Sequence, residues 1–243
     1  MGITDMITRK PIFLAVKQLR GGQSFTLDEV RLLDRAIDEA LAPCAEYRTF
    51  ALKKPAEFFN HLRSTHVLGP VLTPEEVEGC EAIMAACGKD GWGIAWTAYA
   101  LATAYHETAG TMRPIKEYGR GKGRKYGKPG KHLGQVAFGR GYVQLTWDYN
   151  YERADRELAL NGQLTGNYEL ALDPDIAAKI MVGGMADGWF TGKKLGDFLP
   201  IDGKATKESY RRSRPIINGR DKDVLIAGYA MEFQTALAKG EWS

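Results

Sequence analysis

The stretch Trp96-Thr-Ala-Tyr-Ala-Leu-Ala-Thr-Ala-Tyr-His-Glu-Thr-Ala-Gly110 decides the fold of this chain. From Trp92 to Tyr105 nearly every residue is apolar or small, so a helix here is apolar on all sides and belongs inside the protein. The glycine at the end of the stretch suits the left-handed conformation that often ends a helix. The sequence therefore predicts a buried central helix whose last turn carries Glu107.

Two carboxyl groups stand out beside this helix. Glu107 and Glu117 are the only acidic residues between Gly91 and Trp147, a segment with nine Lys or Arg residues. Burial and the helix dipole disfavour the charged form of Glu107, whereas the cations around Glu117 favour its charged form. Such a pair suits the acid and the base of glycoside hydrolysis. The alternative is that Glu117 is a surface ion-pair partner and Glu107 has no special role.

Length and composition are those of an ordinary globular protein. The 243 residues, 44% hydrophobic and 26% charged, allow one domain plus a small module. A net charge of +3 is too small to imply nucleic-acid binding by itself, and no apolar run reaches the roughly 20 residues that span a bilayer. Pro11 to Val16 is too short for a signal peptide. We expect a monomer made in the cytoplasm, without membrane insertion and without a nucleic-acid partner.

The sequence offers no metal-ligand pattern. The three cysteines, Cys44, Cys80 and Cys87, follow no metal spacing, and the last two are seven residues apart and share a helix face, which suits buried free thiols. The sequence from His106 to Gly110 has glycine where the zinc-protease motif needs a second histidine. We therefore expect neither a metal site nor a disulfide scaffold.

Local signals divide the chain into three parts: a helical hairpin over 1–42, a connector over 43–70 and the main domain over 71–243. The pair Gly21-Gly22 separates the two helices of the hairpin, and Thr26 with Glu29 forms a capping box that opens the second, Leu27 to Leu41. A hairpin of this size has little core of its own. It either docks on the main domain, which we favour, or binds another molecule such as the cell wall.

The main domain is predicted to be mainly α with one small sheet. Besides the central helix, the sequence predicts a helix from Thr73-Pro74 to about Cys87, one from Asp175 to about Phe190, and one from about Asp221 to Leu237. The segment from Gln135 to Thr146 is predicted to form a β-hairpin that turns at Gly139-Arg-Gly141. Alternation in its second strand would put Tyr142, Gln144 and Thr146 on one face, lining a cleft.

The loop from Arg120 to His132 carries six Lys or Arg residues and four glycines. A phosphate-binding P-loop is excluded because no Gly-Lys pair here is followed by Ser or Thr. The interleaved Tyr118 and Tyr126 leave nucleic-acid binding conceivable. We favour a mobile active-site loop whose charge suits an anionic substrate.

Three motifs, in order along the chain, resemble glycoside hydrolase family 19. They are His106-Glu-Thr-Ala-Gly110, then Gly139-Arg-Gly-Tyr-Val-Gln-Leu-Thr-Trp147 with Tyr149-Asn-Tyr151, then Ile217-Asn-Gly219. The resemblance spans roughly residues 70 to 240 and implies the α+β lysozyme-like fold of that family's chitinases and phage endolysins. The short leading hairpin and the compact loop after Glu107 look more like the phage endolysin branch.

The resemblance also implies roles for single residues. Glu107 corresponds to the general acid and Thr146 to the hydroxyl residue that holds the attacking water, while the endolysin-like spacing makes Glu117 the base. The family inverts configuration, with carboxyl groups roughly 6.5–9.5 Å apart. The residues expected to bind substrate come from the same motifs and from the predicted strand: His106, Tyr142, Gln144, Tyr149, Asn150 and Asn218. The acidic residue that often follows the family's Asn-Gly motif is replaced by Arg220, which argues against chitinase-type specificity.

The expected function is that of an endolysin, a peptidoglycan hydrolase that cleaves β-1,4 bonds between amino sugars, most readily at N-acetylmuramic acid, and lyses the host cell. It would need no metal or organic cofactor, and would reach the wall once a holin opened the membrane. The alternatives are a chitinase of the same fold, a non-catalytic wall- or carbohydrate-binding protein and, third, a nucleic-acid protein.

Overall fold

The computed structural model describes residues 16–26, 29, 32–33, 49–69 and 71–243. The chain forms two compact units, residues 1–47 and 48–243. In the first unit a helical turn over 16–19 ends at Gly21-Gly22, as predicted, with φ of +65° and +84°. The Thr26–Glu29 capping box is confirmed, since Thr26 N donates to Glu29 Oε2 and Glu29 N to Thr26 Oγ1. Most of the predicted helix Leu27 to Leu41 lies outside the described residues.

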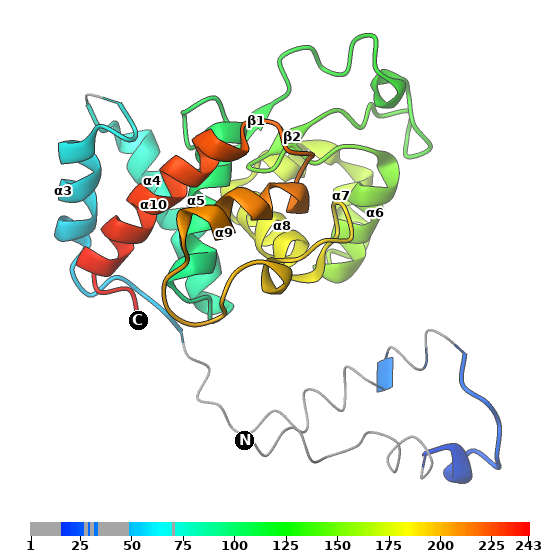
Figure 1. Cartoon of the computed structure of the whole chain (residues 1–243). Helices are drawn as coiled ribbons and strands as arrows, with labels where there is room; N and C mark the ends of the chain where they lie inside the picture. The colour runs from blue at the N-terminus through cyan, green and yellow to red at the C-terminus, as the bar shows by residue number, and fades with distance from the viewer. Residues whose placement is uncertain (1–15, 27–28, 30–31, 34–48, 70) are drawn as a thin grey trace. The chain divides into compact units, whose positions relative to one another are not determined.

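The second unit is built around helix α5 (Ile94–Glu107), which is buried along most of its length as predicted. Helix α10 (Asp223–Lys239) packs along α5, and α9 (Lys207–Ser213) packs on α10 (Figure 1). Helix α4 (Pro74–Lys89) also contacts α5 and packs against α8 (Pro174–Asp187). The prediction of a mainly α fold with one small sheet is confirmed.

Helix α4 begins as the sequence predicts. Thr73 Oγ1 accepts from the backbone N–H of Glu76, whose carboxylate accepts in return from Thr73 N at 2.8 Å. Cys80 and Cys87 lie on the core side of this helix as buried free thiols, which confirms the expectation for them. Burial raises the pKa of both thiols.

The predicted connector is largely part of the main domain. Helix α3 (Pro55–Thr65) begins at Pro55 and buries Phe58, Phe59 and Leu62 against α10 and its surroundings. Phe58, Phe59 and Leu62 form the buried face of this helix. The compact unit therefore begins at residue 48 rather than at 71.

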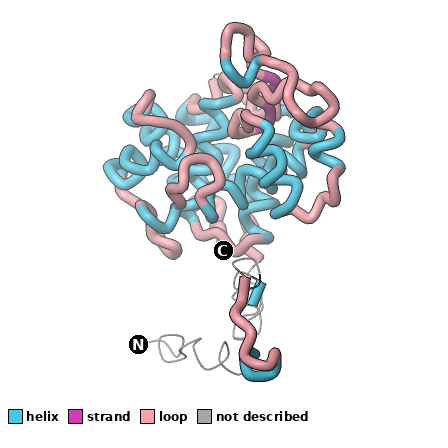
Figure 2. Tube along the Cα trace, turned by 90° about the vertical axis from the view of Figure 1, so that its right-hand side faces the viewer, coloured by secondary structure: helices cyan, strands magenta, loops and turns pink. Residues whose placement is uncertain are grey.

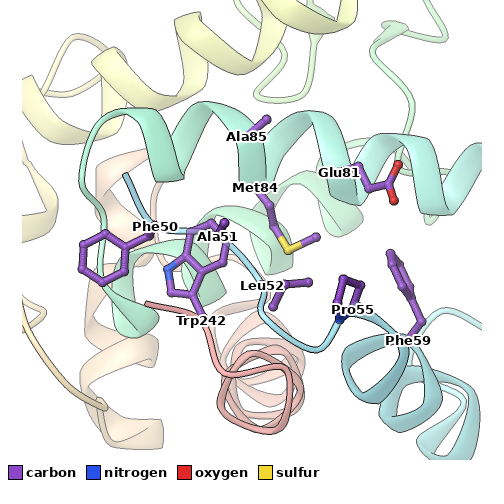
Figure 3. Close-up of a pocket in the computed structure, with 9 residues that line it drawn as sticks. All are labelled: Phe50, Ala51, Leu52, Pro55, Phe59, Glu81, Met84, Ala85 and Trp242. Carbon is purple, nitrogen blue, oxygen red and sulfur yellow. The ribbon is translucent and has the colours of Figure 1, made fainter. Parts of the chain in front are cut away.

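The segment before α3 is hydrogen-bonded to the C-terminal residues. Ala51 and Ser243 exchange backbone hydrogen bonds, and Trp242 Nε1 donates to the carbonyl of Trp92 at 2.8 Å. A pocket of about 220 Å³ lies between this segment and α4, where Met84 extends toward Leu52 (Figure 3). Except for Glu81, the residues that line this pocket are apolar or small.

The sheet differs from the predicted hairpin. Strand β1 (Ile115–Lys116) pairs antiparallel with β2 (Arg140–Gly141), next to the long loops of this unit (Figure 2). The strand expected from Tyr142 to Thr146 is wrong, because the chain turns at once, and Arg140 and Leu145 exchange backbone hydrogen bonds across the turn. A positive φ at Gly141 (+81°) permits this turn.

Several short elements were not predicted. After the turn come helices α6 (Asp148–Glu157) and α7 (Gln163–Gly166). The short 3-10 segments are η2 (Lys125–Gly127), η3 (Tyr168–Leu172), η4 (Leu195–Asp197) and η5 (Arg214–Ile216). Among the helices that the structure describes, none is long and apolar enough to cross a bilayer.

Candidate functional site

The first carboxyl group of the candidate site is held by a buried arginine. Glu107 is the last residue of α5, and Arg214 Nη1 donates to its Oε1 at 2.8 Å. The Arg214 side chain is 2% exposed and that of Glu107 16%. Arg214 Nε also donates to the carbonyl of Asp221 at 2.9 Å. The structure therefore places a buried guanidinium directly against the Glu107 carboxyl group, a contact that the motif around Glu107 does not reveal.

Arg214 also joins the first and third motifs of the sequence. Its carbonyl accepts hydrogen bonds from the backbone N–H groups of Ile217 and Asn218, both at 3.2 Å. The exposed Asn218 accepts from Gly219 N through its own side-chain oxygen at 2.8 Å. The turn that carries Asn218 is therefore fixed to the residue that pairs with Glu107.

His106 precedes Glu107 on the same helix turn and is half-buried. Burial lowers its pKa, and Arg214 and Lys222 act in the same direction, while Glu107 and Asp221 oppose them. The structure thus places His106 among the charged groups around Glu107. Its predicted contact with substrate stays a prediction.

The second carboxyl group has a fixed orientation. Glu117 follows β1, and its two oxygens accept from Tyr126 Oη at 3.0 Å and from Gly139 N at 3.1 Å. A Cβ on Gly139 would lie 2.8 Å from Gln144 Oε1 and 3.3 Å from Glu117 Cβ, so a larger residue there would displace the end of the Gln144 side chain. Burial and the neighbouring carboxylate raise the pKa of Tyr126, which keeps its proton for this hydrogen bond.

A row of aromatic rings extends from Glu117. Tyr126 packs edge to face on Trp147 with 5.4 Å between ring centroids, and Trp147 stacks on Tyr149 with 6.0 Å between ring centroids. Tyr149 is 60% exposed. Trp147 has a φ of +71°, an uncommon backbone conformation for a bulky residue and one that clusters at functional sites. The rings offer flat apolar faces beside the polar groups of the site, as ligand-binding clefts commonly do.

The predicted polar contacts also support the backbone. Gln144 Nε2 donates to the carbonyls of Ile115 and Gly141, both at 3.1 Å, which ties the turn to β1. Asn150 Nδ2 donates to the carbonyl of Thr146 at 2.8 Å. Within the part of the chain that the structure describes, no hydrogen bond engages Gln144 Oε1 or the Thr146 hydroxyl, which suits their predicted contacts with sugar and water.

Tyr142 is separated from Gln144, contrary to the predicted shared face. Its side chain is 1% exposed and lines a pocket with Glu75 and Glu78 instead. The reason is the tight turn from 141 to 144, which ends the alternation on which the prediction depended. The predicted contact of Tyr142 with substrate stays a prediction, without the shared face on which it was based.

Arg140 fixes the segment that faces Glu117. Its buried guanidinium donates to the carbonyl of Phe138, to Tyr151 Oη and to Glu169 Oε1, each at 3.1 Å. It also lies 3.6 Å from the ring centroid of Phe138. Because Gly139 lies between these two anchored residues, its N–H is held against the Glu117 carboxylate.

The basic loop next to this site carries charges without acidic partners. Among the described residues no carboxylate lies within 4.0 Å of the exposed cations Arg120, Lys122, Arg124, Lys125 and Lys128. Farther along, Lys131 and His132 both pair with Glu152 and lower its pKa. The loop extends from the small sheet (Figure 1) and gives the Glu117 side of the site a positive rim.

The structure does not bring together any metal-ligand cluster in the part that it describes: no group of three His, Cys, Asp or Glu side chains there could hold an ion.

Sequence reasoning missed three residues of this site. Arg214 stands four residues before Asn218, in a run already singled out by its Asn-Gly pair, but its partner is 107 residues away. Trp147 ends the longest motif, and Tyr126 lies in the basic loop. A carboxyl group at the end of a buried helix was a signal for a cation such as Arg214. The aromatic residues close to Glu117 in the sequence were a signal for Tyr126.

Comparison with solved structures identifies the fold. The chain is similar to the crystal structure of chitinase C from Streptomyces griseus HUT6037, with a TM-score of 0.51, 20% sequence identity, and coverage of 82% of this chain and 78% of that one. A crystal structure of a chitinase C mutant also matches, with a TM-score of 0.43, 19% identity, and coverage of 83% and 97%. No protein-family model and no curated protein sequence matches. The first likeness confirms the expected α+β lysozyme-like fold class.

Proposed function

We propose that the chain is a glycoside hydrolase that cleaves β-1,4 bonds between amino sugars, with Glu107 as general acid and Glu117 as general base. The observation that carries this proposal is the pair of carboxylates held in fixed orientations, Glu107 by Arg214 and Glu117 by Tyr126 and Gly139. Preorganised acid and base groups are what hydrolysis of a glycosidic bond requires. The fold shared with a chitinase supports the same class of reaction.

In the proposed reaction Glu107 gives its proton to the leaving sugar oxygen while Glu117 takes a proton from the attacking water. Thr146 holds that water, and the product forms with inverted anomeric configuration.

For the substrate we propose peptidoglycan, so that the protein acts as an endolysin. Peptidoglycan is anionic through its lactyl and stem-peptide carboxyl groups. The five exposed cations of the loop from Arg120 to Lys128 lie on the Glu117 side of the site and suit such a substrate. The resemblance to phage endolysins implies synthesis in the host cytoplasm and release to the wall through a holin.

The second candidate is a chitinase. It is favoured by the structural likeness to chitinase C, whereas the basic loop favours the anionic polymer. Turnover of chitin oligomers and of purified peptidoglycan by the same preparation separates the two, and faster turnover of chitin would reject the substrate proposed above. Mass spectrometry of the released reducing ends distinguishes a muramidase from a glucosaminidase.

The variant Glu107→Gln tests whether Glu107 is the acid. We expect hydrolysis to fall by at least about a thousandfold while binding to insoluble peptidoglycan is kept. The matched control is Glu208→Gln, an exposed carboxylate that pairs with Arg211 outside the site. Hydrolysis by the Glu107 variant at the wild-type rate, with the fold verified by circular dichroism, would reject the proposal. A wild-type protein that binds the wall without hydrolysis would be the non-catalytic binding protein.

We also propose that the N-terminal unit helps to bind the wall. A protein lacking residues 1–47 retains the whole second unit, so its turnover of a soluble glycan should be unchanged. Its retention on insoluble peptidoglycan should fall, and equal retention with and without residues 1–47 would contradict this targeting role.

A further inference from the structure

A second pocket, of about 420 Å³, lies away from both candidate carboxyl groups. It is formed by the start of α4, by the segment 112–115 and by the residues before α8, and neither Glu107 nor Glu117 lines it. The volume is within the roughly 300–1,000 Å³ of typical ligand pockets. Its wall is rigid where a Cβ on Gly79 would lie 1.9 Å from the carbonyl oxygen of Met112.

Charges of both signs surround the pocket. Glu75 and Glu78 lie on one side, and Arg113 Nη2 approaches Glu75 Oε1 at 3.6 Å, a loose and exposed pair that stabilises little. No cation of the described chain lies within 4.0 Å of the Glu78 carboxylate. Glu78 and Arg113 are thus available to groups of a ligand with opposite charge.

The unpaired hydroxyl of Tyr142 is the second observation that points to a ligand. The residue is 1% exposed and lines the pocket, and within the described chain no hydrogen bond engages its hydroxyl. A polar ligand group in the pocket would give this hydroxyl a partner. Burial raises the pKa of Tyr142, and Cys80, Asp175 and Asp173 act in the same direction, so the hydroxyl keeps its proton and can donate.

We propose that this pocket binds a short peptide that carries a free ammonium group and a free carboxylate. The ammonium group would pair with Glu78 and Glu75, and the carboxylate with the fork of Arg113. A peptide carbonyl would accept the hydrogen bond of Tyr142. Met112, Ile115 and Leu172 supply apolar wall for a side chain.

This inference stands without the proposed function, because it concerns binding of the peptide alone. If the proposed function holds, the peptides of peptidoglycan are such ligands. The pocket and the Glu117 cleft would then bind two parts of one substrate, since both use strand β1, the pocket through Ile115 and the cleft through the chain after Lys116.

The test is calorimetric titration of the full chain with the tripeptide Ala-Ala-Ala and with its N-acetylated, C-amidated form, which carries neither a free ammonium group nor a free carboxylate. We expect the free tripeptide to bind with a Kd of about 1 mM or tighter, and the blocked form at least about tenfold more weakly. Tyr142→Phe, Glu78→Gln and Arg113→Gln should each weaken binding of the free tripeptide about tenfold, the loss expected for one hydrogen bond or charge pair.

Tyr142→Phe also distinguishes a hydroxyl that binds the ligand from one that has no partner in either state. Removal of the hydroxyl should leave the Tm of the free protein unchanged or higher, because no hydrogen bond to the protein is lost. The rise in Tm that the tripeptide causes in the wild type should shrink in the variant. No detectable binding of the free tripeptide, or binding that all three variants leave unchanged, would overturn the proposal.

Discussion

Loss of the ion pair between Arg214 and Glu107 should lower the free energy of unfolding more than loss of any other side-chain interaction in the candidate site. Arg214→Met removes a 2% exposed guanidinium and leaves a carboxylate that is only 16% exposed without its partner. Removal of one partner from a buried pair costs about 3–5 kcal/mol. The carbonyl of Asp221 loses its donor as well. At about 2–4 °C per kcal/mol for a unit of this size, the Tm should fall by at least about 6 °C.

The assay is urea unfolding of the wild type, Arg214→Met, Glu107→Gln and the double variant, which form a thermodynamic cycle. Both single changes leave a buried charge unpaired, whereas the double variant leaves none. The double variant should therefore lose less free energy of unfolding than the two single losses together, by about 1–3 kcal/mol. Unchanged m-values would show that the variants unfold from the same compact state.

Arg211→Met is the matched control, because Arg211 is on the neighbouring helix and pairs with Glu208 and Asp223 while 45% exposed. Exposed pairs contribute about 0–1 kcal/mol, so this variant should be close to the wild type. The reasoning is refuted if Arg214→Met is as mild as Arg211→Met, or if the two site variants are strictly additive.

Three further outcomes are expected. Glu117→Gln should lower the rate of hydrolysis about a hundredfold. Tyr126→Phe should lower the rate less, since it removes only one of the two hydrogen bonds to that carboxylate. Turnover of a soluble glycan measures both rates, and a near-normal rate for Glu117→Gln would mean that other groups orient the water. Gly88→Ala should destabilise the fold, because its Cβ would lie 1.9 Å from a backbone oxygen, whereas Gly228→Ala in open helix surface should stabilise it by about 0.5–1 kcal/mol in urea unfolding. Because burial lowers the pKa of His106 from its ordinary 6.5, the unfolded chain binds that proton at a higher pH than the folded chain, so the free energy of unfolding declines as the pH falls from about 7. In His106→Gln the urea concentration at the unfolding midpoint should depend less on pH between pH 7 and pH 5. The same pH dependence in the variant and the wild type would contradict this.

The sequence contained enough information for the helical frame. An all-apolar run such as that before Glu107 can only be stable inside a protein, and the Thr73-Pro74 start is a local signal that contacts elsewhere did not override. Helix α3 was missed because its aromatic residues were read without a period, although Phe58, Phe59 and Leu62 are spaced as one helix face.

The small sheet could not be predicted by the same means. Alternation from Tyr142 to Thr146 looked like a strand, yet β2 contains only Arg140 and Gly141 and pairs with a segment 25 residues earlier. What decides this geometry is a set of contacts to groups far along the chain, since Arg140 donates to the Glu169 carboxylate and Gln144 to the carbonyl of Ile115. A periodic pattern in one segment does not show such contacts.

The residues that sequence reasoning found and those that it missed differ in what they do. Glu107, Glu117 and Thr146 are proposed to act in the reaction itself, and short motifs contain Glu107 and Thr146, while the spacing from Glu107 indicates Glu117. Arg214 and Tyr126, which sequence reasoning missed, hold the two carboxyl groups, and each acts across a separation set by the fold. If catalysis depends on fixed carboxylates, the holding residues determine activity as strongly as the motif does. A chain with all three motifs but without a cation at position 214 should therefore be less stable where Glu107 lies in the fold. The motifs alone would then not identify an active hydrolase.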